Sequence, residues 1–180
     1  SDLASAGTLL TIDLDALCAN WRSLRQRLQR AECAAVVKAD AYGLGADRVA
    51  PALAAAGCRH FFVAHLDEAI RLRPYLPSAA AVYVLNGVPP GAEAECIARG
   101  LVPVLNSLQK LDDYARHGRG AQARLPAILQ IDSGMSRLGL SAGEVQALAC
   151  DPHRFDGLNL RFVMSHLACA ERQQHPANSA

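Results

Sequence analysis

The sequence lacks an excess of charge of either sign. Its 180 residues include 18 Lys and Arg and 17 Asp and Glu, a formal net charge of +1, while 51% are hydrophobic. This balance disfavours a disordered chain and leaves no basic surface for nucleic acid. The chain also has no run of like charges of the kind that binds a membrane surface. We therefore expect a globular protein with neither nucleic acid nor membrane as a partner.

Long apolar runs and a leader segment are missing too. The apolar stretches fall short of the ~20 residues that a transmembrane helix needs. The first ten residues, SDLASAGTLL, do not have the basic and then apolar form of a secretory signal. These absences predict a soluble protein of the cytoplasm.

Cysteine is present, but without a disulfide or metal-binding pattern. The six cysteines are irregularly spaced, and no C-x-x-C pair occurs among them. Most lie in apolar or alanine-rich segments, where a free thiol behaves as a small hydrophobic group. We expect free thiols, as in a reducing compartment, and no metal site.

What the chain does contain is a regular alternation of two kinds of segment. Short apolar runs typical of buried strands occur at 33–39, 60–65, 81–86, 102–106, 126–132 and 161–166. Segments with helical spacing precede or separate them, at 14–29, 45–57, 66–76, 107–118 and 141–150. The first helical segment carries an apolar stripe of Leu14, Leu17, Trp21, Leu24 and Leu28. Alternating strands and helices with short links predict an α/β fold with a parallel sheet.

Two architectures with a parallel sheet are consistent with this pattern. A doubly wound nucleotide-binding sheet needs a G-x-G-x-x-G turn after its first strand, and here Gly43 and Gly45 lack the third glycine. A (β/α) barrel instead gathers polar side chains at the carboxyl ends of its strands, around one mouth. Polar residues end most of the apolar runs, namely Lys38, Asn86, Asn106, Asp132, Ser165 and His166. The sequence therefore favours the barrel.

Three segments resemble, in order, the signature segments of the alanine racemase family. They read AVVKADAYGLGA at 35–46, DSGMSRLGL at 132–140 and VMSHLACAE at 163–171. The segments TIDLDALCANW at 11–21 and FFVAHLDEAIRLR at 61–73 look like the N-terminal region of the same family. The resemblance implies a fold type III enzyme that uses pyridoxal 5'-phosphate, with a TIM-type barrel and a separate C-terminal β-domain. It also implies a homodimer that interconverts L-alanine and D-alanine and supplies D-alanine for peptidoglycan.

Lys38 is the predicted centre of the chemistry. It follows Ala34, Ala35, Val36 and Val37, a run that predicts a strand buried on both faces. An ammonium group there is costly, and desolvation lowers a lysine pKa and so supplies the free amine that attacks an aldehyde. The resemblance makes Lys38 the residue that forms a Schiff base with pyridoxal phosphate, and a base on one face of the substrate.

Three more residues follow from the resemblance as cofactor ligands. Tyr42 is implied to contact the phosphate, and Arg137 to approach the phenolic oxygen and the substrate carboxylate. His166 is implied to stack on the pyridine ring or to hold a neighbouring group by a hydrogen bond, without acting as the catalytic base. Asp132 is expected to order the Arg137 loop by accepting bonds from backbone amides, and His65 is expected to be structural.

The chain departs from the family at its end. A closed eight-stranded barrel typically takes ~250 residues, whereas these 180 residues offer about six strands. We therefore expect residues 1–180 to form one barrel domain that is truncated at its C-terminal end and lacks the β-domain, either as a fragment of a longer enzyme or as a reduced chain whose barrel another copy completes. The second catalytic base of the family, a tyrosine of that β-domain across the dimer interface, would then be missing. Such a chain alone should racemise weakly or not at all, and its open sheet should favour self-association.

Other functions remain open at this stage. Within enzymes, the alternatives are a broad-specificity amino-acid racemase and a decarboxylase that uses the same cofactor, although DSGMSRLG argues against the decarboxylase. Outside enzymes, a non-catalytic barrel that binds pyridoxal phosphate would share the barrel and the lysine. Such a protein would not need the Arg137 loop.

Overall fold

The computed structural model describes residues 7–172 and 174–178. Six strands form one sheet: β1 Ala35–Val36, β2 His60–Val63, β3 Ala81–Val84, β4 Val102–Leu105, β5 Leu125–Gln130 and β6 Leu158–Met164. The helices are α1 Leu14–Arg27, α2 Lys38–Tyr42, α3 Ala46–Ala55, α4 Leu66–Leu72, α5 Glu93–Ala98, α6 Leu108–Gly120 and α7 Ala142–Cys150. Short 3-10 turns are η2 Arg73–Tyr75, η3 Pro152–Phe155 and η4 Pro176–Asn178. None of the described helices is both long and apolar enough to cross a membrane.

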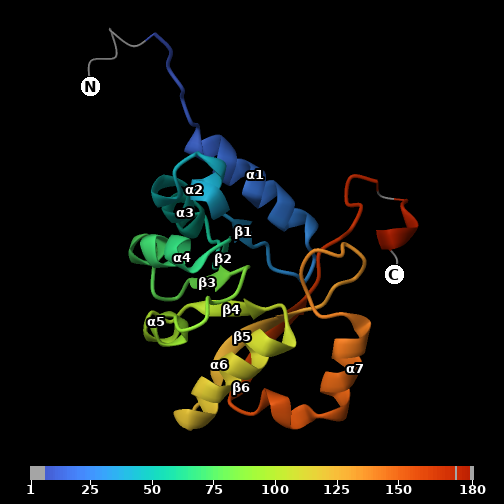
Figure 1. Cartoon of the computed structure of the whole chain (residues 1–180). Helices are drawn as coiled ribbons and strands as arrows, with labels where there is room; N and C mark the ends of the chain where they lie inside the picture. The colour runs from blue at the N-terminus through green and yellow to red at the C-terminus, as the bar shows by residue number, and fades with distance from the viewer. Residues whose placement is uncertain (1–6, 173, 179–180) are drawn as a thin grey trace.

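The sheet is parallel throughout and follows the order of the chain. Its strands pair as β1-β2-β3-β4-β5-β6 (Figure 1). Because each strand pairs with its neighbour in sequence, the chain winds in one direction around the sheet, as in a barrel and not in a doubly wound fold. The predicted barrel architecture is confirmed.

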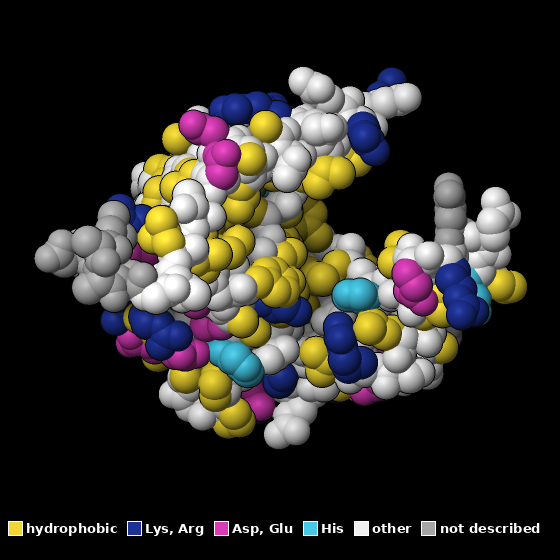
Figure 2. Space-filling model, turned by 90° about the horizontal axis from the view of Figure 1, so that it is seen from above, with side chains coloured by type: hydrophobic (Ala, Val, Ile, Leu, Met, Phe, Trp, Pro, Cys, Tyr) yellow, Lys and Arg dark blue, Asp and Glu magenta, His cyan; other side chains and the backbone are white. Residues whose placement is uncertain are grey.

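The barrel is not closed. Among the described residues no pairing joins β6 to β1. Figure 2, seen from above, shows a wide hollow that opens on one side between two arms and has hydrophobic side chains on its walls. On β6, Phe162 and Val163 are 46% and 60% exposed. Since successive residues of a strand point to opposite sides, both faces of this edge strand are uncovered.

Side chains alternate between the helices and the inside of the barrel. On β2, Phe61 and Val63 belong to the core beneath the helices, whereas Phe62 packs inside against Tyr83 with ring centres 4.6 Å apart. The inner cluster consists of Tyr83, Val102, Val104 and Ile128, with Phe62, Ala81, Leu85 and Met164 packed against it. Phe62, Leu85 and Met164 of this inner layer also line the cavity at the carboxyl ends of the strands.

Two sequence expectations about the first segments are wrong in part. The run 33–39 forms a strand only at Ala35–Val36, and Val36 is 46% exposed, so this strand is not buried on both faces. The reason is that its inner side faces the open hollow. In α1 the expected stripe is partly displaced, because Cys18 and Trp21 are buried while Leu24 and Leu28 are exposed.

Other local expectations are met. Ser107 caps α6 by accepting a hydrogen bond from the Lys110 amide at 3.3 Å. Ser141 and Glu144 form the expected capping box of α7. All six cysteines are free, and burial raises the pKa of Cys96 to about 12, so this thiol stays protonated near neutral pH. Helix α5 was not predicted, because six residues are too few to show a helical period.

A glycine contact between α6 and the start of β6 gives a test of this packing. A Cβ added to Gly118 would lie 2.0 Å from the Gly157 carbonyl oxygen, whereas one added to Gly120 meets nothing within 4 Å. We expect Gly118→Ala to lower the free energy of unfolding by about 2 kcal/mol, because the backbone must move to relieve the clash. Gly120→Ala, in the same helix, should be neutral or slightly stabilising. Urea denaturation of both variants measures the difference, and equal stabilities would contradict the described packing.

Candidate functional site

A cavity of about 500 Å³ opens at the carboxyl ends of the strands. Its lining brings together the four predicted site residues, Lys38, Tyr42, Arg137 and His166. The rest of the lining consists of Ala34, Val36, Phe62, Ala64, Leu85, Leu138 and Met164, with the amides Asn86 and Gln130. Residues far apart in the chain meet here because parallel strands end at the same edge of the sheet.

Lys38 reaches this cavity from a helical turn and not from a strand end. It is the first residue of α2, and its side chain is half-buried. The Nζ atom lies 5.8 Å from the centre of the Tyr42 ring, within the range of a cation–π contact. Tyr42 itself is 64% exposed at the mouth of the cavity.

The turn that carries Lys38 and Tyr42 is left-handed. Ala39, Asp40, Ala41 and Tyr42 have φ values of 50°, 54°, 53° and 56°. A left-handed helical residue other than glycine costs about 1–2 kcal/mol, so four in succession persist only when neighbouring contacts hold them. Gly43, with φ of 85°, ends the turn without this cost.

Two carboxylates bind this turn to neighbouring segments. Asp40 Oδ1 accepts a hydrogen bond from the Ala46 amide at 2.7 Å, at the start of α3. Glu68 Oε1 accepts one from the Ala39 amide at 2.8 Å, directly after Lys38. Glu68 was not predicted as a site residue. Its position in FFVAHLDE indicates only the acidic first turn of a helix.

Arg137 is presented by a loop whose shape depends on Asp132, as expected. Asp132 Oδ1 accepts hydrogen bonds from the Gly134 and Ser136 amides, both at 3.0 Å. These bonds to Ser136 and Gly134 lower the pKa of Asp132. At the base of the loop the Asp132 amide donates to Leu140 O at 2.9 Å, and the Leu140 amide donates to the Gln130 carbonyl at 2.9 Å. The exposed Arg137 side chain therefore lines the cavity from a loop whose two ends are joined by backbone hydrogen bonds.

His166 follows β6 and is exposed on the far side of the cavity from β1. Its Nδ1 lies 2.9 Å from the Leu167 carbonyl oxygen. In this contact Nδ1 carries the proton and Nε2 is left for a ligand. His65, which was expected to be structural, does not line the cavity. Its Nδ1 atom lies 3.4 Å from Asn86 Nδ2.

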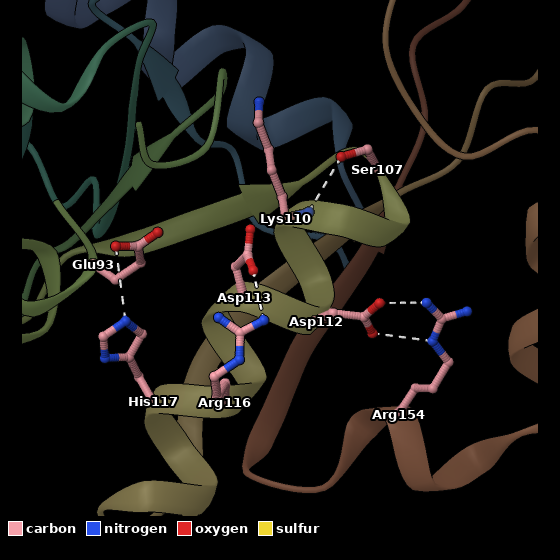
Figure 3. Close-up of polar contacts among 8 residues, drawn as sticks. All are labelled: Glu93, Ser107, Lys110, Asp112, Asp113, Arg116, His117 and Arg154. Carbon is pink, nitrogen blue, oxygen red and sulfur yellow. Dashed lines mark hydrogen bonds and ion pairs between the residues drawn. The ribbon is translucent and has the colours of Figure 1, made fainter. Parts of the chain in front are cut away.

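A lysine beneath the site supports the end of β3. Lys110 Nζ donates to the Asn86 carbonyl at 2.7 Å and to Asn106 Oδ1 at 3.1 Å. Desolvation by burial lowers the pKa of Lys110. Figure 3 shows Lys110 extending from α6 away from His117 and Asp112 of the same helix, which pair with Glu93 of α5 and Arg154 of η3. Sequence reasoning found the two asparagines as strand ends but missed the lysine that joins them.

The chemistry of the lining selects a kind of ligand. It combines the cationic Lys38 and Arg137 with a phenol and an imidazole, and none of its described residues is acidic. Val36, Phe62, Leu85 and Met164 add apolar surface. The cavity therefore suits a flat, partly apolar group that carries an anion and presents a carbonyl to the lysine.

Comparison with known proteins agrees with this geometry. The family model described as "Alanine racemase, N-terminal domain" matches residues 12–180. A catabolic alanine racemase of Mesorhizobium japonicum is 52% identical over 175 residues, which cover 97% of this chain and 46% of that protein. An alanine racemase of Brucella ovis is 51% identical over 178 residues, 99% of this chain and 45% of that protein.

Solved structures give the same result. The crystal structure of alanine racemase from Bartonella henselae with covalently bound pyridoxal phosphate superimposes with a TM-score of 0.90 at 43% identity. That match covers 93% of this chain and 49% of the other. The biosynthetic alanine racemase from Pseudomonas aeruginosa has a TM-score of 0.81 at 30% identity.

The chain spans about half the length of the relatives that it matches. Within that half, the match of fold and sequence extends over nearly every residue. A match of this extent shows that the chain belongs to the alanine racemase family.

Proposed function

We propose that this chain is the cofactor-binding barrel of an alanine racemase and holds pyridoxal phosphate through Lys38. One observation carries the proposal. The amine of Lys38 shares a single cavity with Tyr42, Arg137 and His166, and no described carboxylate lines that cavity. The names of the relatives, and the covalently bound cofactor in the Bartonella henselae structure, support it.

The four side chains fit the chemistry of such a ligand. Lys38 supplies the amine for the covalent bond, and Tyr42 and Arg137 supply donors for anionic oxygens. His166 offers an imidazole to a flat ring at the opposite side. When bound, pyridoxal phosphate supplies an electron sink for the electron pair left by the departing α-proton. Once the amino group of the substrate replaces Lys38 in the covalent bond, the released amine of Lys38 would take and return that proton on one face of the substrate.

Racemisation needs a second proton-transfer group on the opposite face. The family resemblance assigns this role to a tyrosine of the C-terminal β-domain in a partner subunit. We therefore propose that residues 1–180 alone exchange the α-proton of alanine but interconvert its two forms weakly. We propose further that the working enzyme is a homodimer, since Phe162, Val163 and Leu167 leave apolar surface beside the site. The free cysteines fit an enzyme of the cytoplasm.

The chain has a useful feature for testing the covalent bond, because it contains only two lysines, Lys38 and Lys110. We expect pyridoxal phosphate to give an absorption band that borohydride fixes onto Lys38, since that amine faces the cavity. Lys38→Met should abolish the label. Lys110→Met should keep it, because Lys110 Nζ already donates to Asn86 and Asn106. Peptide mass spectrometry locates the label. A label on Lys110, or none on the folded wild type, would contradict the proposal.

The Arg137 loop separates an enzyme from a mere carrier of the cofactor. We expect wild-type protein to exchange the α-proton of alanine in heavy water, and Arg137→Met to slow this exchange by about 10- to 100-fold. That range corresponds to the loss of one charge-assisted hydrogen bond, worth about 1.5–3 kcal/mol. Arg137→Lys should lie between, because it keeps the charge without the forked donors.

Arg116→Met is the matched control for this measurement. Arg116 is exposed on α6, pairs with Asp113 at 2.8 Å and does not line the cavity. Its exchange rate should equal that of the wild type, as followed by proton NMR. Exchange that is absent from wild-type protein loaded with pyridoxal phosphate, without borohydride, would favour the non-catalytic carrier instead.

A further inference from the structure

Glu68 joins two segments of backbone at the edge of the site. Its Oε2 accepts hydrogen bonds from the Ala64 amide at 2.7 Å and the His65 amide at 3.0 Å. Its Oε1 accepts one from the Ala39 amide at 2.8 Å. One carboxylate therefore takes three backbone donors, two from the β2–α4 link and one from the turn that begins with Lys38.

Helix capping explains the hydrogen bond from the His65 amide but not the one from the Ala39 amide. A glutamate at the third position of a helix commonly accepts from the amide before the first turn, as Glu68 does through Oε2 at His65. Glu144 has the same role in α7, where it accepts from the Ser141 amide at 2.8 Å. The bond to Ala39 has no counterpart in capping, because Ala39 lies 29 residues away along the chain.

The segment that Glu68 binds has backbone angles that are unfavourable unless neighbouring contacts stabilise them. Ala39 is the first of four successive residues with positive φ, and it directly follows Lys38. Asp40, the second residue of the turn, ties it to the start of α3 by accepting a hydrogen bond from the Ala46 amide, and Gly43 ends it in a left-handed conformation that glycine adopts readily. Among the described side chains, only Glu68 accepts a hydrogen bond from the end next to Lys38.

Glu68 lies on the outer side of this turn, away from the site cavity. It lines a separate hollow together with Val37, Asp40 and Arg71, and it is absent from the lining that contains Lys38. That outer hollow is open, so water can reach the Ala39 amide if the carboxylate is removed. Removing the carboxylate should therefore change the position of the turn. It should not leave a buried hydrogen-bond donor without a partner.

We propose that Glu68 is a positioning residue for Lys38, fixing the start of the left-handed turn so that the amine points into the cavity. The inference rests on the proposed covalent role of Lys38. Glu68 acts through the backbone and does not touch the ligand, so its removal should slow bond formation at Lys38 while leaving the fold in place.

The experiment compares Glu68→Ala and Glu68→Gln with wild type in the purified full chain. The rate at which pyridoxal phosphate becomes attached to Lys38 is followed by absorbance and by borohydride trapping with peptide mass spectrometry. We expect Glu68→Ala to slow attachment about tenfold, equivalent to about 1.4 kcal/mol at 25 °C. Glu68→Gln should lie between, since its single carbonyl oxygen cannot serve both Ala39 and the β2–α4 link.

Glu144→Gln is the matched control, because it removes one carboxylate oxygen from an equivalent capping box in α7, whose residues do not line the site cavity. Its thermal midpoint should fall about as much as that of Glu68→Gln, but its attachment rate should equal the wild-type rate. An unchanged attachment rate in a folded Glu68 variant overturns the inference. If Glu68→Ala does not fold, Glu68→Gln decides.

Amide hydrogen exchange separates this inference from the proposed function. Peptides that cover 37–43 should exchange faster in both Glu68 variants than in wild type, and at the wild-type rate in Glu144→Gln. If wild-type protein does not attach the cofactor at Lys38, the proposed function fails, and the exchange data alone decide whether Glu68 holds the turn. Unchanged exchange in this segment would show that it does not.

Discussion

The site depends on a four-residue turn that the chain would not adopt by itself. Ala39 to Tyr42 all take left-handed backbone angles, and neither alanine nor tyrosine favours them. Had the backbone continued as a strand beyond Val36, Lys38 and Tyr42 would have lain roughly 13 Å apart along it, at about 3.3 Å per residue. The left-handed turn instead brings Lys38 and Tyr42 to one cavity, with the amine 5.8 Å from the ring centre. The arrangement of Lys38 and Tyr42 therefore depends on contacts around the turn and not on the strand before it.

The parallel sheet determines where the other residues of the site lie. Each crossover returns the chain to the same end of the sheet, so the loops after β1, β5 and β6 converge. Beneath them, the stacked rings of Phe62 and Tyr83 form an apolar floor. The ligand groups thus lie on loops and turns, whereas the strands fix only where those loops begin.

The sequence predicted the parts of this arrangement that repeat. Six apolar runs marked the six strands, and their polar ends marked the mouth of the barrel, because both signals follow from strand period and burial. The three family segments identified Lys38, Tyr42, Arg137 and His166, which do meet in one cavity. The handedness of the Lys38 turn was not predicted, since alanine disfavours positive φ and one aspartate is only a weak signal for a single left-handed residue. The roles of Glu68 and Lys110 could not be found either, because each depends on a backbone group more than twenty residues away.

The open side of the barrel and the exposure of the site have a common cause. Val36 on β1 and Phe162 on β6 are each 46% exposed, and both belong to edge strands of the sheet. A barrel interior is filled by side chains from strands on all sides, so a sheet with two free edges leaves its inner layer half-covered. The same gap lies beside Tyr42 and His166, which are exposed at the mouth. A surface that contacts both β1 and β6 would therefore bury the Lys38 amine and cover the inner layer of side chains at the same time.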